Sequence, residues 1–172
     1  MLGNTRSWRA LIFCAVLGGV IGCFSDSTPS EPSAPGLEPA LVSTGSARLV
    51  TCSRQSARVV SKTIDKYGGN LTLNGHQLSV PPGALSQAVT ITMSAPVDTI
   101  RTVQLSPEGL TFNPLAQPTL SMNYVGCNQA VTGIAYVGND LKLLAFLAST
   151  VDASKGWTST RLAHFSRYAV HY

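Results

Sequence analysis

The chain has 172 residues and lacks the short motifs that mark many enzymes and metal proteins. It contains no Gly-x-Ser-x-Gly element, which presents a nucleophilic serine, and no Gly-x-x-x-x-Gly-Lys loop, which holds a phosphate. It has no Cys-x-x-Cys pair, and His76, His164 and His171 are not spaced like metal ligands on one helix. No two acidic residues stand out as an acid and a base. We therefore expect no metal, no cofactor and no catalysis on other molecules.

The N-terminal apolar run is too short to span a membrane, because Ala10–Ile21 has 12 residues and a spanning helix needs about 20. It follows Arg6 and Arg9, and no acidic residue precedes it. A positive head, a short apolar stretch and a small residue before a junction predict a secretory signal peptide over residues 1–22. The closing segment Val20–Cys23 resembles a bacterial lipobox, which implies cleavage before Cys23 and a lipid on that cysteine.

The residues around Cys23 favour this interpretation over its rivals. Cys14 follows the bulky Phe13, whereas Gly22 is the small residue that such peptidases need before the cleavage point. Residues 23–47 are rich in serine and proline, which predicts an extended, lipid-attached tether. An ordinary signal peptide that is cut elsewhere is the alternative.

The predicted location is the bacterial cell envelope, with the membrane contacted through the lipid on Cys23. Phe24 follows the cysteine where an aspartate would signal retention in the inner membrane, so the outer membrane is favoured. The excess of basic over acidic residues in the whole chain, 12 Lys+Arg against 8 Asp+Glu, is partly due to the predicted signal peptide. Removing Arg6 and Arg9 leaves 10 against 8, a net charge of +2 that does not indicate nucleic-acid binding.

Two cysteines, Cys52 and Cys127, remain for the folded part of the chain. In an oxidising compartment the simplest interpretation is one disulfide between them. Two free buried thiols are the alternative. Residues 48–172, which follow the tether, are long enough for one domain with its own core.

Short alternating segments separated by turn residues predict an all-β fold, a single antiparallel β-sandwich over residues 48–172. Asn74-Gly75 between two such segments is a hairpin signal. The predicted strands are Arg58–Ile64, Asn70–Leu73, Gln77–Val80, Val89–Ser94, Arg101–Leu105, Leu110–Phe112, Thr119–Tyr124, Gly133–Val137, Leu141–Leu147, Trp157–Leu162 and Phe165–His171.

Four basic residues, Arg54, Arg58, Lys62 and Lys66, recur every four positions. The β-branched residues between them favour a strand over a helix. On a strand the four would share one face. We expect a solvated edge that resists sheet-to-sheet aggregation, and contact with anionic headgroups or glycans is the alternative.

Several elements resemble the ZU-five domain of zona-occludens proteins, netrin receptors of the uncoordinated-five type, and ankyrins. The matching segments are Gly68–Leu73, Leu78–Leu85, Val89–Thr92, Leu105–Phe112 and Pro118–Met122. The resemblance extends over roughly Ile64–Tyr172 and includes bacterial lipoproteins with similar domains. It implies a β-sandwich used for protein–protein contact without a cofactor, and it identifies no partner.

One motif points to self-cleavage, because His164-Phe165-Ser166 resembles the His-Phe-Ser site at which some eukaryotic relatives cut their own chain. The resemblance implies that the Ser166 hydroxyl attacks the carbonyl of Phe165 while His164 takes the proton. We favour a structural interpretation, in which Phe165 packs in the core, His164 caps a strand edge and Ser166 faces outward.

A glycan-binding module is a further alternative, since Trp157 with Tyr136 and Tyr168 could stack on a sugar ring. Packing of these rings in or near the core is the more common case. The function that the sequence favours is therefore a non-catalytic, lipid-anchored envelope protein. Its β-sandwich would contact an envelope protein or a surface polymer.

Overall fold

A computed structural model describes residues 48–172 of the chain. The predicted signal peptide, the lipid site Cys23 and the tether therefore lie outside the described residues. Residues 48–172 contain no helix, so none there is long and apolar enough to cross a membrane.

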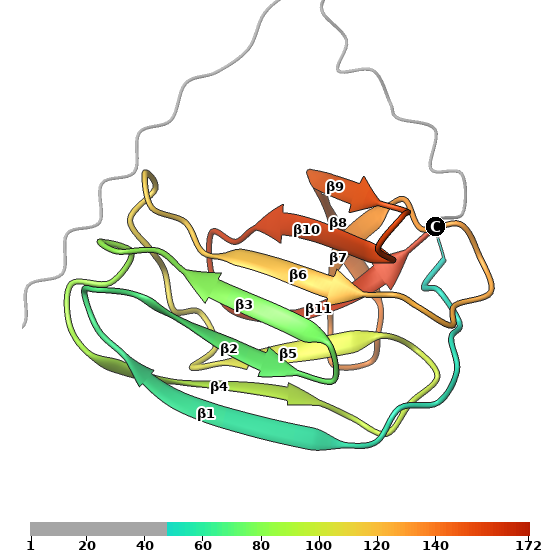
Figure 1. Ribbon diagram of the computed structural model, residues 1–172, viewed down its shortest axis with the longest axis horizontal. Helices are drawn as coiled ribbons and strands as arrows, with labels where there is room; N and C mark the ends of the chain where they lie inside the picture. Colours follow the sequence, from blue (N-terminus) through green and yellow to red (C-terminus); the bar gives the residue numbers. More distant parts are fainter. Residues whose placement is uncertain (1–47) are drawn as a thin grey trace, which may run out of the picture. The chain divides into compact units, whose positions relative to one another are not determined.

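The described residues form two packed antiparallel sheets of six and five strands, which confirms the predicted all-β fold (Figure 1). The six-stranded sheet has the order β1-β4-β5-β11-β7-β8, and the five-stranded sheet has the order β2-β3-β6-β10-β9. The strands are β1 Arg58–Ile64, β2 Gly69–Leu73, β3 His76–Val80, β4 Val89–Ala95, β5 Thr102–Ser106, β6 Thr119–Asn123, β7 Gly133–Val137, β8 Leu143–Leu147, β9 Ser149–Asp152, β10 Trp157–Arg161 and β11 Arg167–His171.

The core lies between the two sheets because each strand alternates apolar and polar side chains. In β4, for example, Ile91 and Met93 are fully buried, and the threonines beside them face out of the sandwich. In β6, Leu120 and Met122 enter the same core from the opposite sheet. This is the alternation from which these strands were predicted.

Backbone angles confirm the predicted hairpin turn and show a second turn that requires glycine. Asn74 and Gly75, between β2 and β3, have φ of 51° and 81°, which is the left-handed region that a tight two-residue hairpin requires. Gly68 has φ of 76°, and a Cβ there would lie 2.3 Å from the carbonyl oxygen of Val80. Only glycine therefore fits where the chain crosses from β1 to β2.

Three strand predictions need correction. Segment 110–112 is not a strand, because only Thr111 pairs, in an isolated bridge with His164. The last strand begins at Arg167 instead of Phe165. Strand β8 begins at Leu143, since Leu141 has a positive φ of 61° inside a turn. The short strand β9 was not predicted, because Ser149–Asp152 follows β8 with no turn residue to separate them.

The two sheets are connected on two sides by chain crossings. On one side β1 leads into β2, and on the other β8 leads into β9 after the single residue Ala148. At the second crossing the Ser149 hydroxyl accepts a hydrogen bond of 3.0 Å from the backbone N–H of Ile134 and donates one of 2.8 Å to the carbonyl of Leu147. The outermost strands of the six-stranded sheet are therefore β1 and β8.

Candidate functional site

The His164-Phe165-Ser166 segment lies between β10 and β11 and is packed against the turn at residues 107–112. Phe165 is fully buried, and its ring meets that of Phe112 edge-on at 4.8 Å. The Phe165 carbonyl accepts a hydrogen bond of 2.8 Å from the N–H of Gly109, and its own N–H donates to Leu110 at 2.9 Å. The predicted packing role of Phe165 is therefore confirmed.

The predicted outward orientation of Ser166 is wrong, because this residue is only 3% exposed. Its hydroxyl donates to Oε1 of Glu108 over 3.5 Å, at the long limit of a hydrogen bond. The Nδ1 atom of His164 lies 3.3 Å from the carbonyl oxygen of Phe165. The hydroxyl is thus bound to the carboxylate of Glu108, while Nδ1 of His164 faces the oxygen of the carbonyl that the hydroxyl would attack.

Sequence reasoning missed Glu108 because it lies 58 positions before Ser166 and next to a proline turn. The only signal for it is its place in the Pro107-Glu108-Gly109 turn, which by itself indicates no chemistry.

The three rings considered for glycan stacking do not form one platform. Tyr168 is buried, and its hydroxyl donates to the carbonyl of His164. Burial is the main cause that raises the pKa of this phenol, with Tyr136 adding to it. Tyr136 packs against Tyr168 at 6.3 Å in the six-stranded sheet, whereas Trp157 belongs to β10 in the other sheet. The residue types were suitable, but the pairing of the strands separates them.

The predicted disulfide is present between Cys52 and Cys127, whose positions are 75 apart. Backbone hydrogen bonds flank it on both sides, from Ser53 N–H to Gly126 at 2.8 Å and from Asn128 N–H to Thr51 at 3.0 Å. It ties the segment that leads into β1 to the loop after β6. This bridge has a structural role in the fold.

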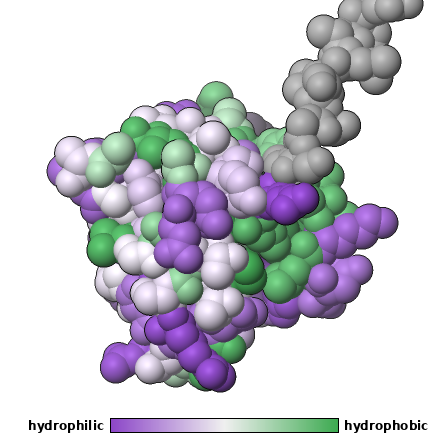
Figure 2. Space-filling model, turned by 90° about the vertical axis from the view of Figure 1, so that its right-hand side faces the viewer, coloured by the Kyte–Doolittle hydropathy of each residue, from purple (hydrophilic) through white to green (hydrophobic). Residues whose placement is uncertain are grey.

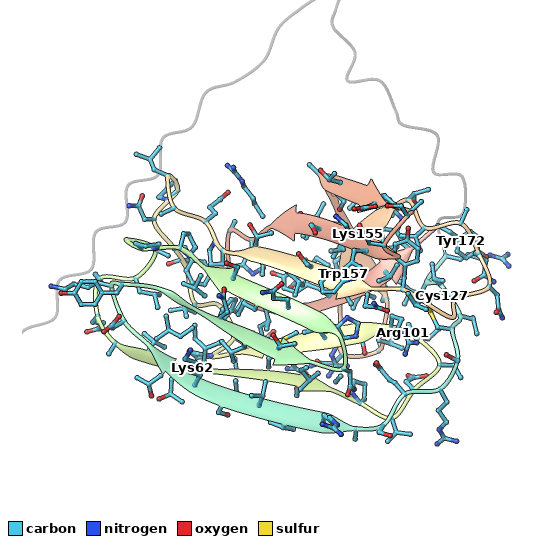
Figure 3. All side chains as sticks on the ribbon, viewed as in Figure 1. Lys62, Arg101, Cys127, Lys155, Trp157 and Tyr172 are labelled. Carbon is cyan, nitrogen blue, oxygen red and sulfur yellow. A yellow bond between two sulfur atoms is a disulfide. The ribbon has the colours of Figure 1, made fainter. Side chains whose placement is uncertain are left out.

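The predicted basic face is formed only in part, by Arg58 and Lys62, which are exposed on the outermost strand β1. Arg54 and Lys66 lie outside β1, and Arg58 and Lys62 have the same parity as Ile64, which is fully buried. Lys62 therefore extends between the two sheets at the edge of the sandwich, where its Nζ lies 3.5 Å from the carbonyl oxygen of Asn70 (Figure 3).

The strand at the opposite edge, β8, is apolar throughout, with the sequence Leu-Leu-Ala-Phe-Leu. It pairs with β7 on one side, and within residues 48–172 no strand pairs with its other side. Leu144 is 50% exposed and Phe146 is 49% exposed. The pairing with β7 shifts between Tyr136 and Val137, which leaves Leu144 as the extra residue of a bulge.

Phe146 occupies the outer face of the six-stranded sheet, where its ring lies 4.7 Å from that of His171. Beneath it, Ala135 and Ala169 are fully buried in a small apolar cluster that is separate from the main core. Figure 2 shows one end of the sandwich, where apolar side chains (green) gather in patches between polar ones (purple). We take the outer edge and face of β8, defined by Leu144 and Phe146, as the candidate functional site and call it the β8 edge.

Neither the models of known protein families nor the sequences of curated proteins match this chain. Among residues 48–172, no three His, Cys, Asp or Glu side chains lie together as a metal site would require. What the β8 edge offers chemically is unpaired backbone and apolar surface, the two features by which a sheet edge recognises another extended chain.

Proposed function

We propose that this protein is a lipid-anchored envelope protein without catalytic activity, and that its β-sandwich contacts another envelope protein through the β8 edge. The observation that carries the proposal is an outermost strand with five apolar residues and no charge, on which Leu144 and Phe146 are half exposed. Exposed apolar edges of this kind are aggregation hazards unless something covers them.

The partner that fits the β8 edge is an extended segment of a second protein. Its backbone would pair with the free side of β8, and alternate side chains would rest against Leu144 and Phe146. Main-chain hydrogen bonds would supply affinity, and the two apolar side chains would supply selectivity. The resemblance to the ZU-five domain supports a contact role, since that domain serves protein–protein contact.

The anchor supports the same function by confinement. A lipid on Cys23 followed by a tether of residues 24–47 would keep the sandwich close to the membrane, within several tens of Å at roughly 3 Å per residue. Confinement raises the effective concentration of a membrane-bound partner, so a contact of moderate affinity is sufficient.

The contact is tested by photo-crosslinking in intact envelopes. A benzophenone-bearing phenylalanine replaces Phe146 in one variant and Val59, which is 69% exposed on β1, in the matched control. We expect one discrete crosslinked protein from position 146, whose crosslinked peptide aligns with β8, and none from position 59. Adding Leu144→Lys should reduce the yield at least tenfold, as loss of a central apolar contact does.

Equal crosslinking at both positions would show that β8 is no special surface and would overturn the proposal. Crosslinking of the chain only to a second copy of itself would also overturn it, in favour of a homodimer.

The anchor has its own test. The mature N-terminus should be Cys23, and Cys23→Ser should leave unprocessed precursor in the membrane fraction. Cys14→Ser is the matched control, and it should be processed normally. A mature N-terminus at any other residue would contradict the anchor and leave the β8 contact to be judged by crosslinking alone.

Self-cleavage after Phe165 is the second candidate function. It is favoured by one observation, the Ser166 hydroxyl beside a Glu108 carboxylate with the Phe165 carbonyl already bound by the N–H of Gly109. Such a donor would stabilise charge on the carbonyl oxygen during attack. The test of this candidate is the integrity of the chain at Phe165.

A further inference from the structure

A buried positive charge lies at the disulfide end of the sandwich. Arg101, directly before β5, is only 8% exposed, and Figure 3 shows it between the sheets near Cys127. Its guanidinium binds neutral oxygens alone, with Nη1 donating to Gln55 Oε1 at 3.1 Å and Nη2 donating to the Val125 carbonyl at 3.2 Å. Residues 48–172 contain one ion pair, Lys155–Asp152, so no carboxylate neutralises Arg101. A buried charge without a counter-charge is costly.

Three hydrogen-bond donors around this charge have no acceptor among residues 48–172. They are Nε of Arg101, Nε2 of His76 and the amide nitrogen of Gln55. His76 is 1% exposed, and its Nδ1 accepts the N–H of Asn123 at 3.1 Å. The proton of the neutral ring is therefore on Nε2, which makes that atom a donor.

The three donors belong to one neighbourhood. The carbonyl oxygen of the Gln55 side chain is bound to the guanidinium, so its amide group lies next to Arg101. His76 and Arg101 are bound to the same short segment, since Nδ1 of His76 accepts the N–H of Asn123 and Nη2 of Arg101 donates to the carbonyl of Val125. In keeping with this, the charge of Arg101 adds to burial in lowering the pKa of His76 to about 4. The neutral ring of His76, the amide of Gln55 and the cation of Arg101 thus present free N–H groups and no negative charge.

We propose that this cluster binds a small monovalent inorganic anion of the chloride type, held by the N–H groups of Arg101, His76 and Gln55. An anion accepts all three donors and neutralises the guanidinium. A water molecule has two lone pairs and would accept two of them at most. Arg101 and His76 are 8% and 1% exposed, which favours a small ion over a phosphate ester or an organic acid.

Thermal unfolding of the full chain tests the proposal, with sodium chloride compared against sodium gluconate at equal ionic strength. We expect the midpoint to rise with chloride until the site saturates, and to stay flat in gluconate. Arg101→Gln should abolish the difference between the salts. His76→Leu, which removes one donor, should weaken the apparent chloride affinity about tenfold. The matched control is Lys155→Gln, a surface cation, which should behave like the wild type.

Equal midpoints in the two salts, or a chloride effect that survives Arg101→Gln, would overturn the proposal. If Arg101→Gln does not fold, crystals of the wild-type protein grown in sodium bromide decide the question. An anomalous bromide peak within hydrogen-bond distance of Arg101 Nε and His76 Nε2 would support it, and an ordered water with no anomalous signal at that point would overturn it.

Discussion

The two outermost strands of the six-stranded sheet, β1 and β8, differ in the side chains that surround their unpaired edges. Strand β1 places Lys62 between the sheets, and on its outer face Ser61 and Thr63 pair with threonine hydroxyls of β4 at 2.7 and 3.0 Å. Strand β8 has no charged or hydroxyl-bearing residue and exposes Leu144 and Phe146. An inward-pointing charge discourages the addition of another strand, and an apolar edge invites it.

The difference between the β1 and β8 edges shows that an exposed strand is not by itself a binding site. Val59 on β1 is more exposed than Phe146 on β8, yet it is surrounded by the polar groups of a protected edge. Position within the sheet and the chemistry of the neighbours decide which edge can accept a partner. The experiments below test whether the two edges differ in stability and association as their chemistry predicts.

Loss of the disulfide should loosen the approach to β1 and leave β8 in place. The double substitution Cys52→Ser with Cys127→Ser opens a loop of 75 positions. The chain-entropy model gives this closure a value of roughly 4 kcal/mol, and measured bridges often give less. Denaturant unfolding should show the loss, and hydrogen exchange should show faster opening of residues 48–58 than of β8. Equal acceleration in both regions would contradict a local role for the bridge.

Acid should weaken the whole sandwich, because His76 lies in the interior and serves neither edge alone. Burial, with the charge of Arg101 adding to it, lowers the pKa of His76 from 6.5 to about 4. The unfolded chain therefore binds the proton first, so stability is complete above pH 6.5, falls as pH drops from 6.5 to 4, and falls no further from this group below 4. The expected loss is about 3 kcal/mol, at 1.36 kcal/mol for each pKa unit.

The pH effect is measured by urea unfolding at pH 7 and pH 4. His76→Gln should remove most of the slope, and the matched control His164→Gln, at a half-buried surface site, should keep it. Burial also lowers the pKa of His171, which contributes in the same direction. A slope unchanged in His76→Gln would assign the effect to that second histidine.

Ser166→Ala tests the chemistry next to β11, in the middle of the same sheet. Because the hydroxyl is buried and its bond to Glu108 is long, we expect a cost of about 1 kcal/mol rather than the smaller cost of a surface serine. Mass spectrometry under denaturing conditions should show the wild-type chain intact at Phe165. A stoichiometric fragment ending at Phe165, absent in Ser166→Ala and in Glu108→Gln, would establish self-cleavage.

Lys62→Leu is the smallest change and makes the β1 edge chemically similar to the β8 edge. Folding stability should change by no more than about 0.5 kcal/mol, since the lysine bond to Asn70 is long and partly exposed. Self-association should rise, and sedimentation velocity over a range of protein concentrations measures it. Lys66→Leu, outside the strand, is the control. Unchanged association in Lys62→Leu would show that the charge does not protect this edge.

Much of the fold was predictable because β-strands and tight turns leave local signals. Arg58–Ile64 and Gly133–Val137 were predicted with the bounds that the structure has. Asn74-Gly75 identified the hairpin between β2 and β3 because few residues tolerate two successive positive φ angles. The disulfide was predictable from the cysteine count and the predicted oxidising compartment, without knowledge of the fold.

The candidate site was not predictable in the same way. Nothing in the segment Leu143–Leu147 distinguishes an outermost strand from a central one, since both are apolar runs. The sequence shows that Lys62 and Ile64 share one face of β1. Which face of β1 turns toward the core depends on how the strand is placed in its sheet, beside β4. The contacts of Arg101 with Gln55 and of Ser166 with Glu108 join residues 46 and 58 positions apart.

Local patterns in the chain predicted most strands, their turns, the cysteine pair and the all-β class, because alternation and turn chemistry act between near neighbours. The order of the strands, and with it which edges are open and which polar groups are buried, depends on the packing of the whole molecule. This dependence has a physical cause. Pairing of distant strands is selected by the fit of the whole core, and no short segment of the chain contains that information.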